Sequence, residues 1–171
     1  MKISLYKALI VTILFSYTNI AEAKSWKANI SGPFDGMTYG NMSIVQNEFE
    51  LTFSCNNHDG PKYRLKVELG SSNLPTLPLY GQDEPARLSF LFTLHEGVLV
   101  RELWKAKWFN NGRGTETWIG EIGTGAGRLN ALSRAVKLDL IDQKGKLISS
   151  FGTKGTSAAI AKLRQACHYK R

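Results

Sequence analysis

The chain has 171 residues, of which 22 are Lys or Arg and 14 are Asp or Glu, so its formal net charge is +8. This length suits one ordinary domain with its own hydrophobic core, and the absence of internal repeats excludes a repeat array. The basic balance favours acidic partners such as polyanionic glycans, lipid head groups or nucleic acid, although the same charge also serves simple solubility.

The N-terminal segment has the features of a secretory signal peptide. In MKISLYKALIVTILFSYTNIAEAKSW, two lysines precede an apolar stretch from Ala8 to about Tyr17, and Ala21-Glu22-Ala23 is a small-x-small cleavage site. A membrane anchor is the alternative, but the apolar stretch is about half of the roughly 20 residues that a spanning helix needs. We therefore expect cleavage after Ala23.

This cleavage defines the expected domain organisation, with a signal peptide over residues 1–23 and a single globular β-rich domain over residues 24–171. The first 23 residues carry a net charge of +1, so 148 residues with a net charge of +7 remain. No later segment is long and apolar enough to cross a membrane. We expect a soluble mature protein that is periplasmic or secreted, for which nucleic acid is not an expected partner.

Alternation of apolar and polar side chains predicts strands along most of this domain. In EFELTFSC, the apolar residues from Phe49 to Cys55 share one strand face, and YRLKVEL alternates in the same way. Further strands are predicted within residues 87–109 around a turn at Glu96-Gly97, in ETWIGEI, and in a hairpin of Val136 to Ile141 and Lys146 to Phe151 joined at Gln143-Lys144-Gly145.

Helical signals are sparse. One short helix is predicted from Leu129 to about Ala135, and a C-terminal helix is predicted to start at Thr156 or Ser157, where a hydroxyl is available as N-cap. The expected fold is mainly β, a single antiparallel β-sandwich or flattened barrel with a C-terminal α-helix packed on it.

The two cysteines, Cys55 and Cys167, are 112 positions apart, and both fall on apolar faces. Cys55 continues the apolar face of its strand, and Cys167 recurs at helical spacing with Ile160 and Leu163. Exported proteins keep disulfides, so we predict a bridge that joins the last helix to a core strand. A nucleophilic thiol is the alternative, but it needs a nearby base and an accessible, electropositive site.

The closing residues FGTKGTSAAIAKLRQAC resemble the C-terminal signature of small exported proteins of Gram-negative bacteria, including the invasion-associated locus B type. The residues that match are Phe151, Gly155, Thr156, Ala158, Ala159, Leu163 and Cys167. This resemblance implies a periplasmic or secreted β-rich domain, often of unknown activity and sometimes linked to host association.

No motif in the chain predicts an enzyme. Gly123-x-Gly125-x-Gly127 lacks the spacing of a dinucleotide loop, because Arg128 occupies the place of the third glycine. The three histidines are scattered, and neither H-E-x-x-H nor G-x-S-x-G occurs. We therefore predict no catalytic residue, no cofactor and no metal site, while a small secreted hydrolase with a scattered His, Asp and Glu site stays as the alternative.

The segment RELWKAKWFNNGRGTETW combines tryptophans with basic residues. Strand alternation puts Trp104 and Trp108 on one side and Lys105 and Lys107 on the other. Aromatic rings beside cations bind sugars and acidic groups, whereas the alternative is a core face opposite lysines that discourage edge aggregation. The candidate ligand-binding residues are Trp104, Lys105, Lys107, Trp108, Arg113 and Trp118.

These observations together predict an exported, non-enzymatic binding or accessory protein of the envelope or of host association. Its expected partner is an anionic glycan, a lipid or an envelope protein.

Overall fold

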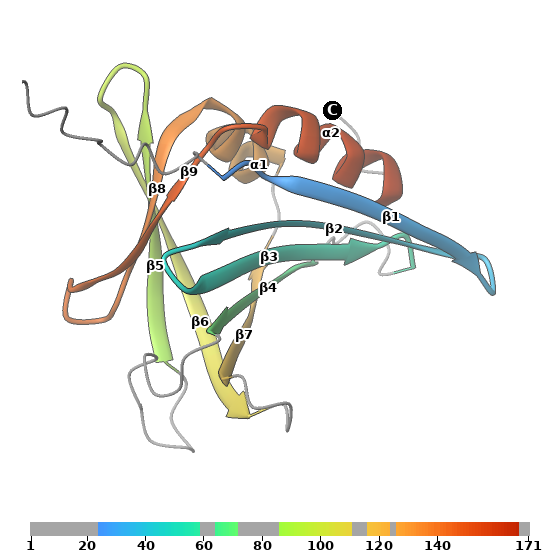
Figure 1. Ribbon diagram of the computed structural model, residues 1–171, viewed down its shortest axis with the longest axis horizontal. Coiled ribbons are helices and arrows are strands. Elements are labelled where there is room, and N and C mark those ends of the chain that lie inside the picture. The colour runs from blue at the N-terminus through green and yellow to red at the C-terminus, as the bar shows by residue number, and fades with distance from the viewer. Residues whose placement is uncertain (1–23, 59–63, 72–85, 111–115, 124–125, 168–171) are drawn as a thin grey trace, which may run out of the picture.

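The computed structural model describes residues 24–58, 64–71, 86–110, 116–123 and 126–167, and the expected signal peptide lies outside these ranges. The described part of the chain consists of strands and two short helices (Figure 1). The elements are β1 Lys27–Phe34, β2 Met37–Gln46, β3 Phe49–Asn56, β4 Arg64–Ser71, β5 Ala86–Leu94, β6 Leu99–Asn110, β7 Glu116–Gly123, α1 Ala126–Arg134, β8 Ala135–Ile141, β9 Leu147–Gly152 and α2 Thr156–Cys167.

The strands pair antiparallel in the order β1-β2-β3-β4-β7-β6-β5-β8-β9. Figure 1 shows β1 to β4 running across the view while β5 to β9 run from top to bottom, so the sheet is strongly bent and its two halves enclose the core. Helix α2 packs against the inner side of β1 and β2. This architecture confirms the prediction of an antiparallel, sandwich-like β fold with a C-terminal helix packed on it.

Most predicted elements occur where the sequence patterns indicate them. The residues of β3 alternate between buried and more exposed, as predicted from EFELTFSC. The turn at Glu96-Gly97 separates β5 from β6, β8 and β9 form the predicted hairpin, and α1 and α2 match the two helical signals. Among the described residues, neither helix has the length and hydropathy to span a bilayer.

The β1–β2 hairpin was not predicted, because β1 is an edge strand whose residues are exposed on both faces except for the partly buried Ala28. Its sequence therefore shows no alternation. The available signal was Asp35-Gly36, which forms the two-residue turn with φ values of 50° and 77°. Positive φ at both positions is typical of a type I′ turn, for which Asp-Gly is a favoured pair.

The two edges of the sheet approach each other at one corner, where hydrogen bonds join them. The backbone N–H of Trp26 donates to the carbonyl of Lys154 at 2.9 Å, and its indole Nε1 donates to the carbonyl of Gly152 at 2.8 Å. The N–H of Gly152 donates to Oε1 of Gln46 at 2.9 Å. Both backbone polar groups of Gly152 at the end of β9 are thus satisfied by side chains, those of Trp26 and Gln46.

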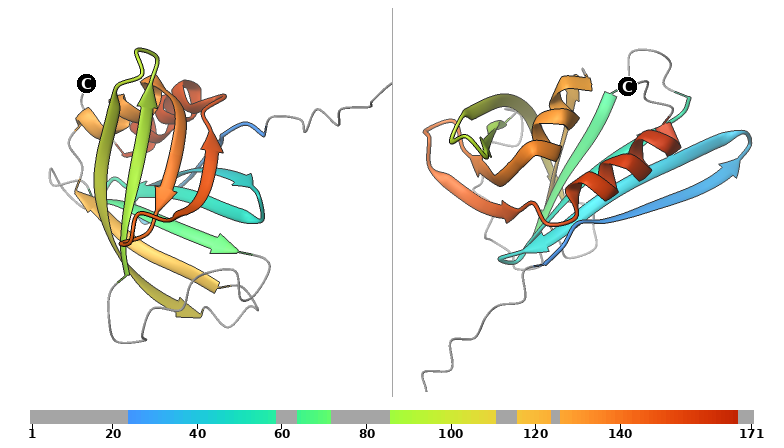
Figure 2. Two further views of the ribbon diagram at one scale, coloured as in Figure 1. Left: turned by 90° about the vertical axis from the view of Figure 1, so that its left-hand side faces the viewer. Right: turned by 90° about the horizontal axis from the view of Figure 1, so that it is seen from above.

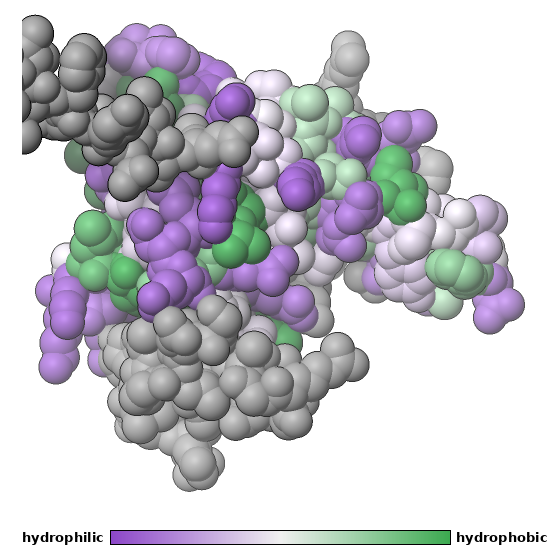
Figure 3. All heavy atoms as spheres, in the orientation of Figure 1, coloured by the Kyte–Doolittle hydropathy of each residue, from purple (hydrophilic) through white to green (hydrophobic). Residues whose placement is uncertain are grey.

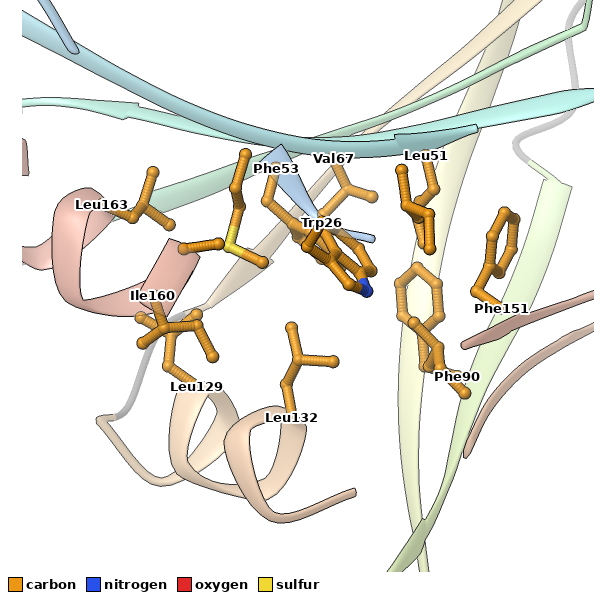
Figure 4. Packing of buried hydrophobic residues seen from close by; sticks show 14 of the residues in the cluster. Trp26, Leu51, Phe53, Val67, Phe90, Leu129, Leu132, Phe151, Ile160 and Leu163 are labelled. Carbon is orange, nitrogen blue, oxygen red and sulfur yellow. The ribbon is translucent and has the colours of Figure 1, made fainter. Parts of the chain in front are cut away.

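The core lies on the inner face of the bent sheet and beneath the helices (Figure 4). Phe53 is at its centre, with its ring centroid 5.6 Å from that of Trp26 and 5.9 Å from that of Phe90. Leu132 of α1 and Ile160 of α2 are also buried against this cluster. Trp26, which comes directly before β1, therefore ties the start of the domain to both halves of the sheet.

The predicted disulfide between Cys55 of β3 and Cys167 of α2 is present, with a Cα–Cα distance of 6.0 Å and both side chains buried. It fixes the last turn of α2 to the sheet. The helix begins at Thr156, one of the two predicted starts. The Thr156 hydroxyl donates a 2.8 Å hydrogen bond to the carbonyl of Thr153, so in the described contacts it is a donor to the preceding turn rather than an N-cap acceptor.

Candidate functional site

The tryptophan-rich segment forms β6 and β7, and the structure gives the backbone register of its four predicted β6 residues. The Cα of Trp104 pairs with that of Leu88, and the Cα of Trp108 pairs with that of Trp118. Leu88 and Trp118 are both fully buried. The two tryptophan positions of β6 are therefore register neighbours of core residues. The candidate residue Arg113 lies outside the described residues.

Trp118 is a core residue rather than a surface contact, which corrects its place among the candidate ligand-binding residues. Strand β7 lies between β4 and β6, in the middle of the sheet, and the Trp118 side chain is fully buried. A buried tryptophan is removed from water, and its large side chain contributes to packing.

The lysine positions of β6 have different neighbours. The Cα of Lys105 pairs with Arg87 on β5 and with Glu121 on β7, and the Cα of Lys107 pairs with Ile119. The Arg87 side chain is exposed. Directly paired residues share a sheet face, so the lysine positions belong to the outer face, opposite the core.

The register of β5, β6 and β8 brings further cations to this outer face. Leu91 of β5 pairs with Arg101, and Thr93 of β5 pairs with Lys137. The inner positions that alternate with them on β5, Phe90 and Phe92, are buried. Three exposed cations from three adjacent strands therefore share the outer face, and we call them the cationic face: Arg87, Arg101 and Lys137.

Two carboxylate positions near the cationic face follow from the same register, Glu121 of β7, which pairs with Lys105, and Asp139 of β8, which pairs with Leu91. Asp139 accepts a 2.5 Å hydrogen bond from the Ser150 hydroxyl at Oδ1, and its Oδ2 lies 2.8 Å from Nζ of Lys137. This pair largely cancels one positive charge of the cationic face. Within the described ranges, Arg87 and Arg101 have no ion-pair partner. The face therefore keeps two arginines that are open to an external anion.

The contact of Lys137, Asp139 and Ser150 also brings together a hydroxyl, a carboxylate and an ammonium group. The two carboxylate oxygens of Asp139 are thus both engaged by protein groups, one by the Ser150 hydroxyl and one by the Lys137 ammonium. The Ser150–Asp139 contact is a hydrogen bond between paired strands, and the Lys137–Asp139 contact is an ion pair between residues on the same face of β8. We therefore assign it a structural role in joining β8 to β9.

The described histidines are separated in the fold. His58 is exposed after β3, and its backbone N–H donates a 2.9 Å hydrogen bond to Oδ1 of Asn56. His95 is exposed in the β5–β6 turn, and the adjacent Glu96 lies 4.0 Å from Arg134. His168 lies outside the described residues. Over the described ranges, no three His, Cys, Asp or Glu side chains are grouped in a way that could hold a metal ion.

The space-filling view agrees with a polar surface over this half of the molecule. In Figure 3, hydrophilic residues dominate the visible described surface over β8 and β9, with separate hydrophobic patches among them. The three residues of the cationic face were not candidates from sequence. The pairing of β5 with β8 joins segments about 45 residues apart, so no local signal in the sequence brings these residues together.

Neither a protein-family model, nor a curated protein, nor a solved structure matches this chain. The residues of the chain itself therefore carry the functional conclusion.

Proposed function

We propose that this chain is an exported, non-enzymatic binding or accessory protein of the cell envelope or of host association, and that its partner is anionic. The signal-like N-terminus and the buried Cys55–Cys167 disulfide support an oxidising compartment outside the cytoplasm. The net charge of +8 favours an acidic partner over a basic one.

The observation that carries the proposal is the cationic face. Arg87 and Arg101 are exposed on the same side of adjacent strands and have no ion-pair partner within the described ranges. Guanidinium groups bind carboxylate, sulfate and phosphate oxygens through paired N–H donors. The Lys105 position, one of the candidate ligand-binding residues, pairs with Arg87 and so belongs to the proposed surface.

The alternative of a small secreted hydrolase has less support. His58 and His95 are exposed in different loops, and the described carboxylate nearest to a hydroxyl, Asp139, is paired with Lys137. A general base must lie within hydrogen-bond reach of the group that it deprotonates, and it needs a free oxygen or nitrogen there, whereas both oxygens of Asp139 are engaged by Ser150 and Lys137.

Retention on immobilised heparin, an anionic glycan, tests the proposal. The Arg87→Gln/Arg101→Gln variant is compared with Lys144→Gln/Lys146→Gln, whose two lysines are exposed at the β8–β9 turn. Both changes lower the net charge of the processed chain from +7 to +5, so a global effect shifts them equally. We expect the arginine variant to elute at clearly lower salt, because exposed charges are screened over about 8–10 Å and act locally.

Equal elution of the two variants, with both still folded, would mean that attraction to heparin is a property of the whole molecule. The cationic face would then not be a binding site. A third variant, Lys105→Glu/Lys107→Glu, asks whether the basic positions of β6 extend the site beyond Arg87.

A further inference from the structure

Exposed aliphatic side chains gather at one end of the sheet, where β5 turns into β6 and α1 meets β8. The exposed fractions are 52% for Val98, 59% for Leu99 and 43% for Val136. The turn is tight, because the N–H of Leu94 donates to the carbonyl of Val98 and the N–H of Gly97 donates to the carbonyl of Leu94, both at 2.9 Å. Figure 2 (left) shows this turn projecting beyond the neighbouring strands.

Leu99 borders the cationic face, and Val98 precedes it in the turn. Leu99 pairs with Thr93, which pairs on its other side with Lys137, so the three residues form one row across the outer face. Arg101 follows Leu99 by two residues and has the same facing. Arg134, at the end of α1, is 65% exposed and lies 4.0 Å from the equally exposed Glu96. Apolar and cationic side chains are therefore contiguous at this end of the molecule.

We infer that the anionic partner is a lipid surface, bound at the β5–β6 end of the domain; this inference rests on the proposed function. Anionic head groups bind the cations, and the aliphatic side chains enter the boundary between head groups and acyl chains. A sulfated or carboxylated glycan offers charge but little apolar surface, so it leaves Val98, Leu99 and Val136 in water. An anionic lipid surface can contact both the cations and the exposed aliphatic side chains. The two kinds of residue together therefore favour a lipid over a glycan.

Two other turns also present apolar residues, and each fits a lipid surface less well. Phe34, in the β1–β2 turn, is 63% exposed but is followed by Asp35, for which the described residues supply no ion-pair partner, whereas Glu96 of the β5–β6 turn lies 4.0 Å from Arg134. An unpaired carboxylate is repelled by anionic head groups. Leu147, near Lys144 and Lys146, is the single large exposed aliphatic residue of the described β8–β9 turn. These turns supply matched controls.

Co-sedimentation with vesicles tests the inference on the chain purified from the periplasm of an expressing bacterium. The vesicles contain phosphatidylcholine alone or with a one-third share of phosphatidylglycerol. We expect binding to the anionic vesicles, little binding to the neutral ones, and release at high salt. The Val98→Ser/Leu99→Ser variant should bind at least about tenfold more weakly, because it lacks two exposed aliphatic side chains that would enter the lipid. Arg101→Gln should also bind roughly fivefold more weakly, because Arg101 is two residues from Leu99, whereas Arg87 lies at the far end of β5.

The control Val45→Ser/Leu147→Ser removes the same kind of side chain from two other exposed positions and should leave vesicle binding unchanged. An equal loss in this control, or a loss in Phe34→Ser, would overturn the placement at the β5–β6 end. Circular dichroism of each variant confirms that it is folded. Absence of binding to anionic vesicles, while heparin retention still depends on Arg87 and Arg101, would overturn the lipid inference and leave the proposed function standing. If neither vesicle binding nor heparin retention depended on these residues, both the lipid inference and the proposed function would be wrong.

Discussion

Gly40 is the residue whose substitution tests the contact between α2 and the sheet most directly. A Cβ at this position would lie 2.7 Å from Cβ of Ala166 and 3.3 Å from both Sγ of Cys167 and Cδ1 of Leu163. The first distance is well below van der Waals contact. Glycine therefore allows the last turns of α2 to approach β2 closely enough for the disulfide to form.

We expect Gly40→Ala to lower the free energy of unfolding by about 1–3 kcal/mol, the usual cost of inserting a methyl group into a packed core. Urea unfolding followed by tryptophan fluorescence measures it. Gly152→Ala is the control, because a Cβ there would meet only Oε1 of Gln46 at 3.7 Å. A loss no larger for Gly40→Ala than for this control would show that α2 can shift to make room.

At the scale of elements, α2 gains its stability from its inner face. Ile160, Leu163 and Ala166 are buried, while Lys162 and Gln165 are exposed. The helix has no acidic residue in its first turn, so favourable interaction with the helix dipole is limited to its last turn. A 12-residue helix is marginal in isolation, so packing decides whether it forms.

Leu163→Ala should therefore destabilise the protein by about 2–4 kcal/mol, the common range for a buried leucine. Lys162→Ala removes an exposed side chain one position away and should change the stability by less than about 0.5 kcal/mol. Chemical unfolding of both variants gives the comparison. Small and equal effects would mean that α2 does not pack as described.

The alternation of apolar and polar side chains predicted those strands that have one buried face and one solvent-exposed face. Strand β3 is such a case, and its register with β2 and β4 follows its apolar face. Strand β1 is the opposite case, because an exposed edge imposes no pattern on its side chains. The strand was not predicted, and the one signal for it was the turn residues Asp35 and Gly36, which act through backbone conformation rather than hydrophobic pattern.

The whole molecule is held together by elements that are distant in sequence. The disulfide joins residues 112 positions apart, and Trp26 contacts the end of β9 through Gly152. In the loop-entropy model, a cross-link over this separation stabilises the folded state by about 4–5 kcal/mol, mainly by restricting the unfolded chain. The disulfide is therefore a large part of the 5–15 kcal/mol typical of domains of about this size.

Two measurements check this at the level of the intact protein. A non-reduced digest of protein from the periplasm should contain one cross-linked peptide pair, with Cys55 and Cys167. The Cys55→Ala/Cys167→Ala variant should unfold at markedly lower urea concentration, by up to about 4–5 kcal/mol. Two free thiols in the native protein, or equal stability of the double variant, would contradict the assigned role of the bridge.

The amino-acid sequence by itself determined the β-rich class, most strand positions, the C-terminal helix and the cysteine pair, because each depends on local periodicity or on composition. It also showed the basic charge, but not where that charge gathers. Only the tertiary structure decided that Trp118 belongs to the core and that Arg87, Arg101 and Lys137 share one outer face. The physical reason is that strand order and register arise from packing of the whole sheet, so residues on β5, β6 and β8 become neighbours through contacts that no single segment encodes.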